Sequence, residues 1–102
     1  MGADPSDAYK ANSTNYLKAF GQNVRRLREE VKPRLSQERL ADITGLHRTE
    51  IGKIEQGQVD ARLMTLHLVA HALNVTLNDL TKSLPVPPQR DPWGRYKRGK
   101  PD

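Results

Sequence analysis

The sequence lacks cysteine altogether, which excludes a disulfide scaffold, a thiolate metal site and a cysteine nucleophile. Aromatic residues are scarce at 5%, and hydrophobic residues reach 35%, below the share of about 45–50% in globular domains. The 102 residues therefore allow one small core with part of the chain outside it. No apolar run exceeds the three residues 68–70, too short for a membrane span or a signal peptide. We expect a soluble, cytoplasmic protein.

Positive charge is concentrated near the C-terminus. Of the 17 basic and 12 acidic side chains, six basic and two acidic ones lie in residues 81–102, against ten and eight in residues 16–80. The net charge of +5 makes a polyanion the natural partner. Because most of the excess lies in the last segment, net charge alone does not locate a nucleic-acid-binding surface.

The spacing of apolar residues predicts five short helices between two flanking segments. Residues 1–15 are small and polar, and we interpret them as an N-terminal tail. A first helix is predicted after its N-cap Asn15 and is stopped by Pro33. Others are predicted at 37–44, 47–56 and 63–73, and residues 75–80 are expected to form a turn and a final short helix. No stretch alternates with period two for long enough to form a strand. We therefore expect an all-α, compact five-helix domain over residues 16–83, followed by an extended, basic, Pro-rich tail over residues 84–102.

Apolar stripes on the first and fourth predicted helices identify an expected core. Residues three or four apart share one face of a helix, so each stripe is expected to pack inward. The first helix carries Leu17, Phe20, Val24, Leu27 and Val31, and the fourth carries Leu63, Leu66, Val69, Ala70 and Leu73.

Residues 37–56 have the composition that two helices need in order to cross steeply through a short turn. Ala41 is small enough for close contact between the helices, and Gly45 supplies the positive φ that the turn requires. Ile51 and Ile54 are placed to bury the inner side of the second helix. Its other side stays polar, as a helix that enters a DNA groove requires, through His47, Arg48, Thr49, Gly52, Lys53 and Gln56.

These residues resemble the lambda-repressor-like, Cro/XRE-type helix-turn-helix DNA-binding domains. The resemblance lies in L-S-Q-E-x-L-A from residue 35, G-L-H-R-T-x-I-x-K-I-E-Q-G from residue 45, and M-T-L-x-x-V-A-H-A-L-N-V from residue 64. It covers residues 17–81 and is specific, because a small residue, a glycine, two aliphatics and the I-E-x-G ending coincide at the right spacings.

The resemblance implies a role for each matching position. Base contacts are expected from Arg48, Thr49 and Lys53, with His47 nearby, and an arginine has the chemistry to contact guanine with two hydrogen bonds. Phosphate contacts are expected from Gln37, Gln56, Gly57, Arg62 and Ser36. Arg28 and Glu55 match a pair that forms an internal ion pair in relatives. Glu50 either accepts a hydrogen bond from cytosine or completes a capping box with His47, and its third position in the helix favours the cap.

The function implied is sequence-specific binding of double-stranded DNA by a transcriptional regulator, such as a repressor. A homodimer would place two copies of the helix at 47–56 in successive major grooves, about 34 Å apart on a palindromic operator. The candidate dimer surface is formed by Leu77, Leu80 and Leu84, although the fifth helix could instead close the core. Narrower alternatives are a restriction–modification controller protein and an antitoxin. A more distant one is a protein-interaction module that keeps the fold without binding DNA.

Other chemistry has little support in the sequence. His67 and His71 form H-L-V-A-H, but Leu68 replaces the glutamate of a zinc-protease motif and no third ligand is apparent. We interpret both histidines as structural or surface residues, and we expect no metal, no cofactor, no membrane partner and no enzymatic activity. The tail combines Trp93 and Tyr96 with Arg90, Arg95, Lys97, Arg98 and Lys100. It is a candidate DNA-binding arm or a site for a protein partner, or else a solvated or self-packing segment.

Overall fold

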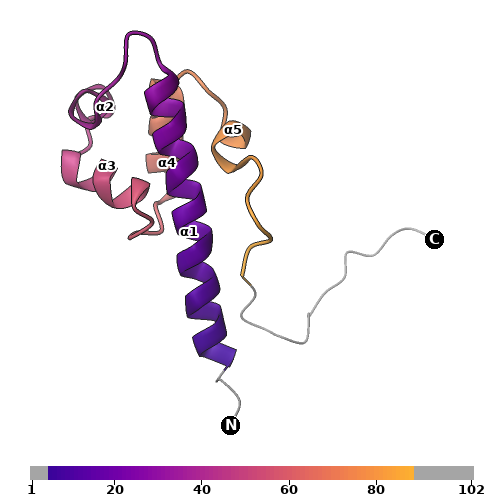
Figure 1. The fold of residues 1–102 in the computed structure, drawn as a ribbon. Helices are drawn as coiled ribbons and strands as arrows, with labels where there is room; N and C mark the ends of the chain where they lie inside the picture. Colours follow the sequence, from indigo (N-terminus) through magenta and orange to yellow (C-terminus); the bar gives the residue numbers. More distant parts are fainter. Residues whose placement is uncertain (1–4, 89–102) are drawn as a thin grey trace.

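In the computed structural model, five α-helices follow one another, with no strand between residues 5 and 88 (Figure 1). The structure describes the backbone of these residues and the side chains from residue 9 onward; the tail residues 89–102 lie outside the described part. No helix in the described part is long and apolar enough to cross a membrane. The predicted all-α, five-helix fold is confirmed, with the helices α1 (Pro5–Glu30), α2 (Gln37–Thr44), α3 (Arg48–Glu55), α4 (Leu63–Ala72) and α5 (Leu77–Thr81).

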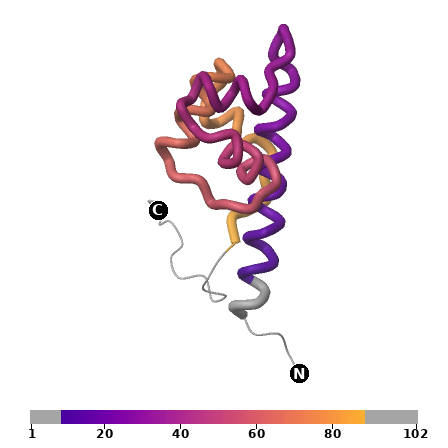
Figure 2. The backbone as a smooth tube through the Cα atoms, turned by 90° about the vertical axis from the view of Figure 1, so that its left-hand side faces the viewer, coloured from indigo at the N-terminus to yellow at the C-terminus, as the bar shows by residue number. Residues whose placement is uncertain are grey.

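The long helix α1 forms the axis on which the shorter helices are arranged. It contacts α3 on one side and α5 on another, α2 contacts both α3 and α4, and α4 also contacts α5 (Figures 1 and 2). The enclosed core contains Val24 of α1, Leu40 of α2, Ile51 of α3, Val69 of α4 and Leu80 of α5, each fully buried. Every helix therefore contributes to a single core.

The predicted start of the first helix is wrong, because α1 begins at Pro5 and not after Asn15. Proline is compatible with the first turn of a helix, where its missing N–H has no partner to lose. Farther along, Tyr9 and Tyr16 line a groove together with Pro88, far along the sequence. Periodicity within residues 1–15 could not reveal this groove, because the stripe of α1 that faces it is aromatic and polar.

The expected placement of two leucines also differs from the structure. Leu63, expected in the core, is 68% exposed, because α4 presents Val69 and Ala70 inward instead. Leu80 is fully buried, so it closes the core and its side chain is not available at a dimer surface. Its predicted companions Leu77 and Leu84 are half-buried against the same core.

Candidate nucleic-acid interface

The ends of α2 are fixed by local interactions. The Oγ of Ser36 accepts a hydrogen bond from the backbone N–H of Arg39 at 3.0 Å, and this N-cap leaves Gln37 as the first residue of the helix. Gly45 ends α2 with φ of +75°, a left-handed conformation that glycine adopts without strain. The turn between α2 and α3 is therefore set by residues of the motif itself.

The start of α3 is held by a second cap, centred on His47. Its Nδ1 accepts a hydrogen bond from the N–H of Thr49 at 3.1 Å and lies 2.9 Å from the Thr49 hydroxyl. The carboxylate of Glu50 accepts from the His47 N–H at 3.5 Å, which confirms the capping interpretation of this glutamate. The first turn of α3 is thus fixed before any ligand is present. His47 and Thr49, both predicted near bases, are held against each other.

Five of the predicted contact residues line one shallow hollow of about 300 Å³ across α2 and α3. Gly52 contributes to its floor, where an added Cβ would meet nothing within 4 Å, so a ligand has unobstructed access to the α3 backbone. Gln58 also lines the hollow, although the sequence analysis did not predict it. It follows the motif in the sequence and comes to lie beside α3 only because the chain turns after Gly57. The side chains that line the hollow are Gln37, Arg48, Thr49, Lys53, Gln56 and Gln58.

A buried ion pair fixes α3 against α1 beneath this hollow. The Arg28 guanidinium donates to both carboxylate oxygens of Glu55, at 2.7 and 2.9 Å, and its third nitrogen donates to the carbonyl of Leu35 at 2.9 Å. Both side chains are less than a tenth exposed. The hydrogen bond with Glu55 raises the pKa of Arg28 above its usual value, so the arginine stays charged. This is the pairing that the family resemblance implies.

The same carboxylate positions Gln37. The Gln37 amide nitrogen donates to Glu55 Oε1 at 3.0 Å, and the side chain is only partly buried. An amide nitrogen carries two hydrogens, so one remains for a phosphate oxygen. The ion pair therefore holds the predicted phosphate-binding amide at the edge of the hollow.

Arg48 is also restrained across the motif. Its Nε lies 3.5 Å from the carboxylate of Glu38 on α2, with both side chains well exposed. An exposed pair of this kind contributes little to stability. The pair leaves the guanidinium exposed beside the hollow.

The three residues beyond α3 that were predicted to contact phosphate lie in different surroundings. Gln56 is exposed, but Gly57 is buried and its N–H donates to the Ile54 carbonyl at 3.1 Å. The expectation for Gly57 is therefore corrected: its φ of +71° and its close approach to Lys18 make it a packing residue of the loop. Arg62 occupies the N-cap position of α4 without a side-chain capping hydrogen bond, and it lines a second hollow of about 370 Å³.

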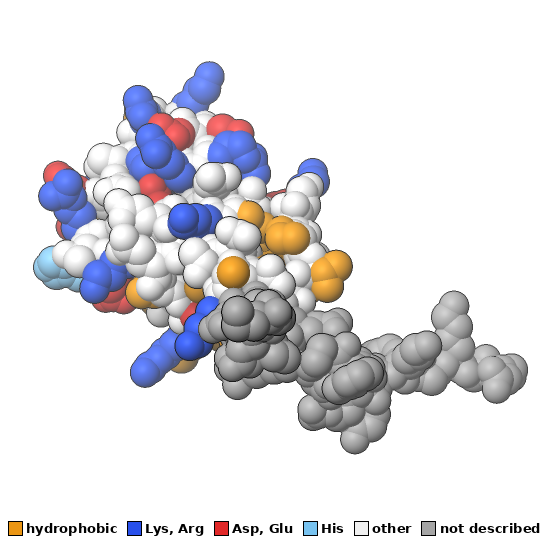
Figure 3. All heavy atoms as spheres, turned by 60° about the horizontal axis from the view of Figure 1, so that its bottom comes forward, with side chains coloured by type: hydrophobic (Ala, Val, Ile, Leu, Met, Phe, Trp, Pro, Cys, Tyr) orange, Lys and Arg blue, Asp and Glu red, His pale blue; other side chains and the backbone are white. Residues whose placement is uncertain are grey.

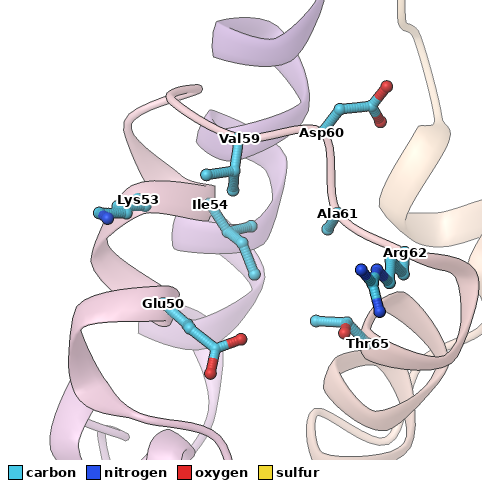
Figure 4. Close-up of a pocket in the computed structure, with 8 residues that line it drawn as sticks. All are labelled: Glu50, Lys53, Ile54, Val59, Asp60, Ala61, Arg62 and Thr65. Carbon is cyan, nitrogen blue, oxygen red and sulfur yellow. The ribbon is translucent and has the colours of Figure 1, made fainter.

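Figure 4 shows this second hollow between α3 and the start of α4. Glu50 points into it towards Arg62 and Thr65, whereas Lys53 points away from it. Lys53 nevertheless lines both hollows, so α3 separates the two.

The charged surface is mixed in sign. In Figure 3, Lys and Arg side chains are interspersed with acidic ones and do not form one continuous patch. Within the described residues there is no cluster of three or more His, Cys, Asp or Glu side chains with the geometry for a metal. The site is thus a polar surface with a few positioned cations and amides, suited to hydrogen bonding along a groove.

Comparison with known proteins agrees with this geometry. The sequence profile of the helix-turn-helix family matches residues 24–80, more than half of the chain, so the chain belongs to this family. The fold and the family together define a DNA-binding transcription regulator of the Cro/CI type.

Three proteins similar to this chain are controller or control proteins by name. The crystal structure of the restriction-modification controller protein C.AhdI from Aeromonas hydrophila has a TM-score of 0.58 and 38% identity, over 65% of this chain and 96% of that one. Control protein C.BamHI from Bacillus amyloliquefaciens is 40% identical over 68 residues, 67% of this chain and 83% of that protein. Control protein C.SmaI from Serratia marcescens is 50% identical over 46 residues, 45% of this chain. The match spans about half of C.SmaI, 55% of its length.

Proposed function

We propose that this protein is a regulator of the restriction–modification controller kind, which binds a palindromic DNA operator as a homodimer through α3. The convergence of the predicted contact residues around one hollow carries the proposal. The names of the three relatives support the narrower assignment. The proposed activity is binding, without catalysis, cofactor or metal, and its DNA target places the protein at the nucleoid in the cytoplasm.

Each side chain around the hollow has a role in this proposal. Arg48 contacts a guanine edge and Lys53 contacts a base or a phosphate one turn further along α3. Gln37, held by Glu55, donates its second amide hydrogen to a phosphate at the groove edge. The caps of α2 and α3 fix these groups before binding, which lowers the entropic cost of association.

The outer face of α4 is the surface that we assign to the second copy. A helix that is apolar on all sides is usually buried, yet α4 exposes a large part of its apolar surface. A single chain carries one recognition helix, whereas a palindromic operator needs two related by a two-fold axis. Pairing α4 with its copy would satisfy both requirements through Leu63, Met64 and Leu68, which are 68%, 78% and 42% exposed.

DNA recognition is tested by selection from a randomised duplex pool, followed by sequencing of the retained DNA. We expect an enriched palindrome whose half-sites lie about one helical turn apart. Retention without enrichment, or binding that does not weaken as salt rises, would contradict sequence-specific binding of DNA.

The role of Arg48 is tested on the selected duplex. Arg48→Ala should weaken binding by roughly 1–3 kcal/mol and relax the preference at one base pair. Arg25→Ala is the matched control, because Arg25 on α1 is equally exposed and also pairs with a glutamate, Glu29. The control should keep the full base preference. An Arg48→Ala variant with unchanged base preference would show that Arg48 does not contact a base.

The dimer surface is tested by molar mass in solution. Leu68→Glu places a charge on the exposed face of α4 and should yield a monomer with unchanged helical content. Val86→Glu, at an aliphatic residue 79% exposed outside α4, should leave the dimer intact. A Leu68→Glu protein that remains dimeric would place the interface elsewhere.

A further inference from the structure

The exposed face of α4 carries two histidines among its apolar residues. His67 and His71 are both exposed and lie four residues apart, so they share one face of the helix with about 5–6 Å between their Cβ atoms. Both line one hollow of about 400 Å³, to which Asn78 of α5 also contributes. Within the described part of the chain, neither imidazole has a hydrogen-bond or ion-pair partner. The two rings are therefore available to a ligand.

These histidines occupy the middle of the surface that we assign to the second copy. At about 100° per residue, the two imidazoles lie between Leu63 on one side and the pair Met64 and Leu68 on the other. An interface with two-fold symmetry joins the same patch of both copies, so residues at its centre meet their own counterparts. Pairing through this face would therefore bring four imidazoles together around the two-fold axis.

Four imidazoles are a ligand set that suits zinc. Imidazole nitrogen binds this ion well, and structural zinc sites are almost always closed by four ligands in a tetrahedral arrangement. Two histidines at positions i and i+4 of one helix can bind the same ion. Within the described residues, no cluster of three or more His, Cys, Asp or Glu side chains is suited to a metal, so one chain supplies only half of such a site. A second copy supplies the other half, whereas imidazoles buried in the pair without partners would cost free energy.

We propose that His67 and His71 of two copies form a zinc site on the two-fold axis, which stabilises the dimer. The inference rests on the α4 dimer surface of the proposed function. It adds a metal-dependent step, because zinc raises the fraction of dimer and thereby the affinity for a palindromic operator. The contacts of α3 with DNA still involve no metal. Asn78, which shares the hollow, can accept a hydrogen bond from the ring N–H that does not bind the ion.

The test measures the dimer dissociation constant of the full-length protein by sedimentation equilibrium, once in EDTA and once in Zn²⁺. If zinc binds only the dimer, free Zn²⁺ at about ten times its own dissociation constant should lower the dimer dissociation constant about tenfold. Equilibrium dialysis against Zn²⁺ should give one ion for every two chains. His67→Gln with His71→Gln removes both ligands, and zinc should then leave the dimer dissociation constant at the value that this variant has in EDTA.

A second variant distinguishes a site shared by two copies from a chelate within one chain. Leu68→Lys keeps both histidines and charges the same face, without adding a carboxylate ligand beside them. Its affinity for Zn²⁺ should therefore fall together with its tendency to pair. Undiminished affinity for Zn²⁺ in this variant, or one ion for each chain in the parent protein, would show a chelate within one chain and overturn the inference.

The remaining outcomes separate this site from the proposed function. A parent dimer whose dissociation constant zinc does not change would overturn the inference alone. A zinc effect that survives the loss of both histidines would do the same. A parent protein that is monomeric in EDTA and in Zn²⁺ alike would overturn the proposed dimer and this inference with it. Selection of a palindrome in EDTA tests DNA recognition without the metal, so the two proposals can fail separately.

Discussion

The buried pair Arg28–Glu55 allows the sharpest test of how the site is built. Glu55→Gln keeps the shape of the side chain and removes the charge that Arg28 faces at 2.7 and 2.9 Å. Arg28, whose side chain is 8% exposed, is then a buried cation without its counterion. Breaking one side of such a pair costs about 3–5 kcal/mol. The total free energy of unfolding of a domain of this size is about 5–15 kcal/mol.

The expected loss of stability is therefore large enough to measure by urea unfolding followed by circular dichroism. For a small domain, each kcal/mol of lost unfolding free energy lowers the melting temperature by about 4–8 °C. The melting temperature should therefore fall by at least about 12 °C. The double variant Arg28→Met with Glu55→Met removes both charges and should recover most of the stability, because apolar replacements of a buried pair are often neutral. The coupling free energy in the double-mutant cycle should be about 2 kcal/mol or more.

DNA binding by the double variant separates the two roles of the pair. Gln37 loses the acceptor that holds its amide at 3.0 Å, so affinity should fall for all DNA sequences alike while the fold is retained. A Glu55→Gln protein that loses less than about 1 kcal/mol would refute the assignment of a buried, mutually dependent pair. A double variant whose loss of unfolding free energy equals the sum of the losses of the two single variants would refute it as well.

Two further changes test local features of the fold. Gly45→Ala, where a Cβ meets nothing within 4 Å, should cost about 1–2 kcal/mol from its positive φ alone. Gly57→Ala should cost roughly 3 kcal/mol or more, since its Cβ would also collide with the α1 backbone; equal losses in urea unfolding would contradict this packing. Hydrogen bonds from the N-cap Thr76 lower the pKa of Asp79, so its contribution to stability is present above the ordinary carboxyl pKa and is lost as the pH falls through the lowered value. In Asp79→Asn, the free energy of unfolding should therefore fall less steeply as the pH is lowered into the acid range. An unchanged dependence on pH would contradict this.

Helix boundaries within the motif followed from local chemistry. Gly45 ends α2, and His47 with Glu50 begins α3, as the sequence predicted. Each of these interactions joins residues within four positions of one another, so the pattern of residue types is sufficient to identify it. The inward placement of Ile51 likewise follows from helical periodicity and is observed.

The long-range contacts depend on how the helices pack. Leu63 fits the predicted apolar stripe and Leu80 was assigned to a dimer surface, yet the first is exposed and the second is fully buried, because burial depends on which helix packs against each face. Gly57 fits the pattern of a phosphate contact, but the proximity of α1 makes it a packing residue.

Spacing and capping were sufficient to identify the helix-turn-helix motif and the residue types on its polar face. The part that α1 takes in forming a groove with the segment after α5, in contrast, could be seen only in three dimensions. Its early turns and the segment after α5 line one groove, which brings Tyr9 and Pro88 to the same place although no local pattern connects them. Packing of the helices also brought Gln58 to the hollow and joined Gln37 to the buried pair through Glu55. Periodicity reports only the neighbours within one helix, whereas these contacts arise when separate helices pack together.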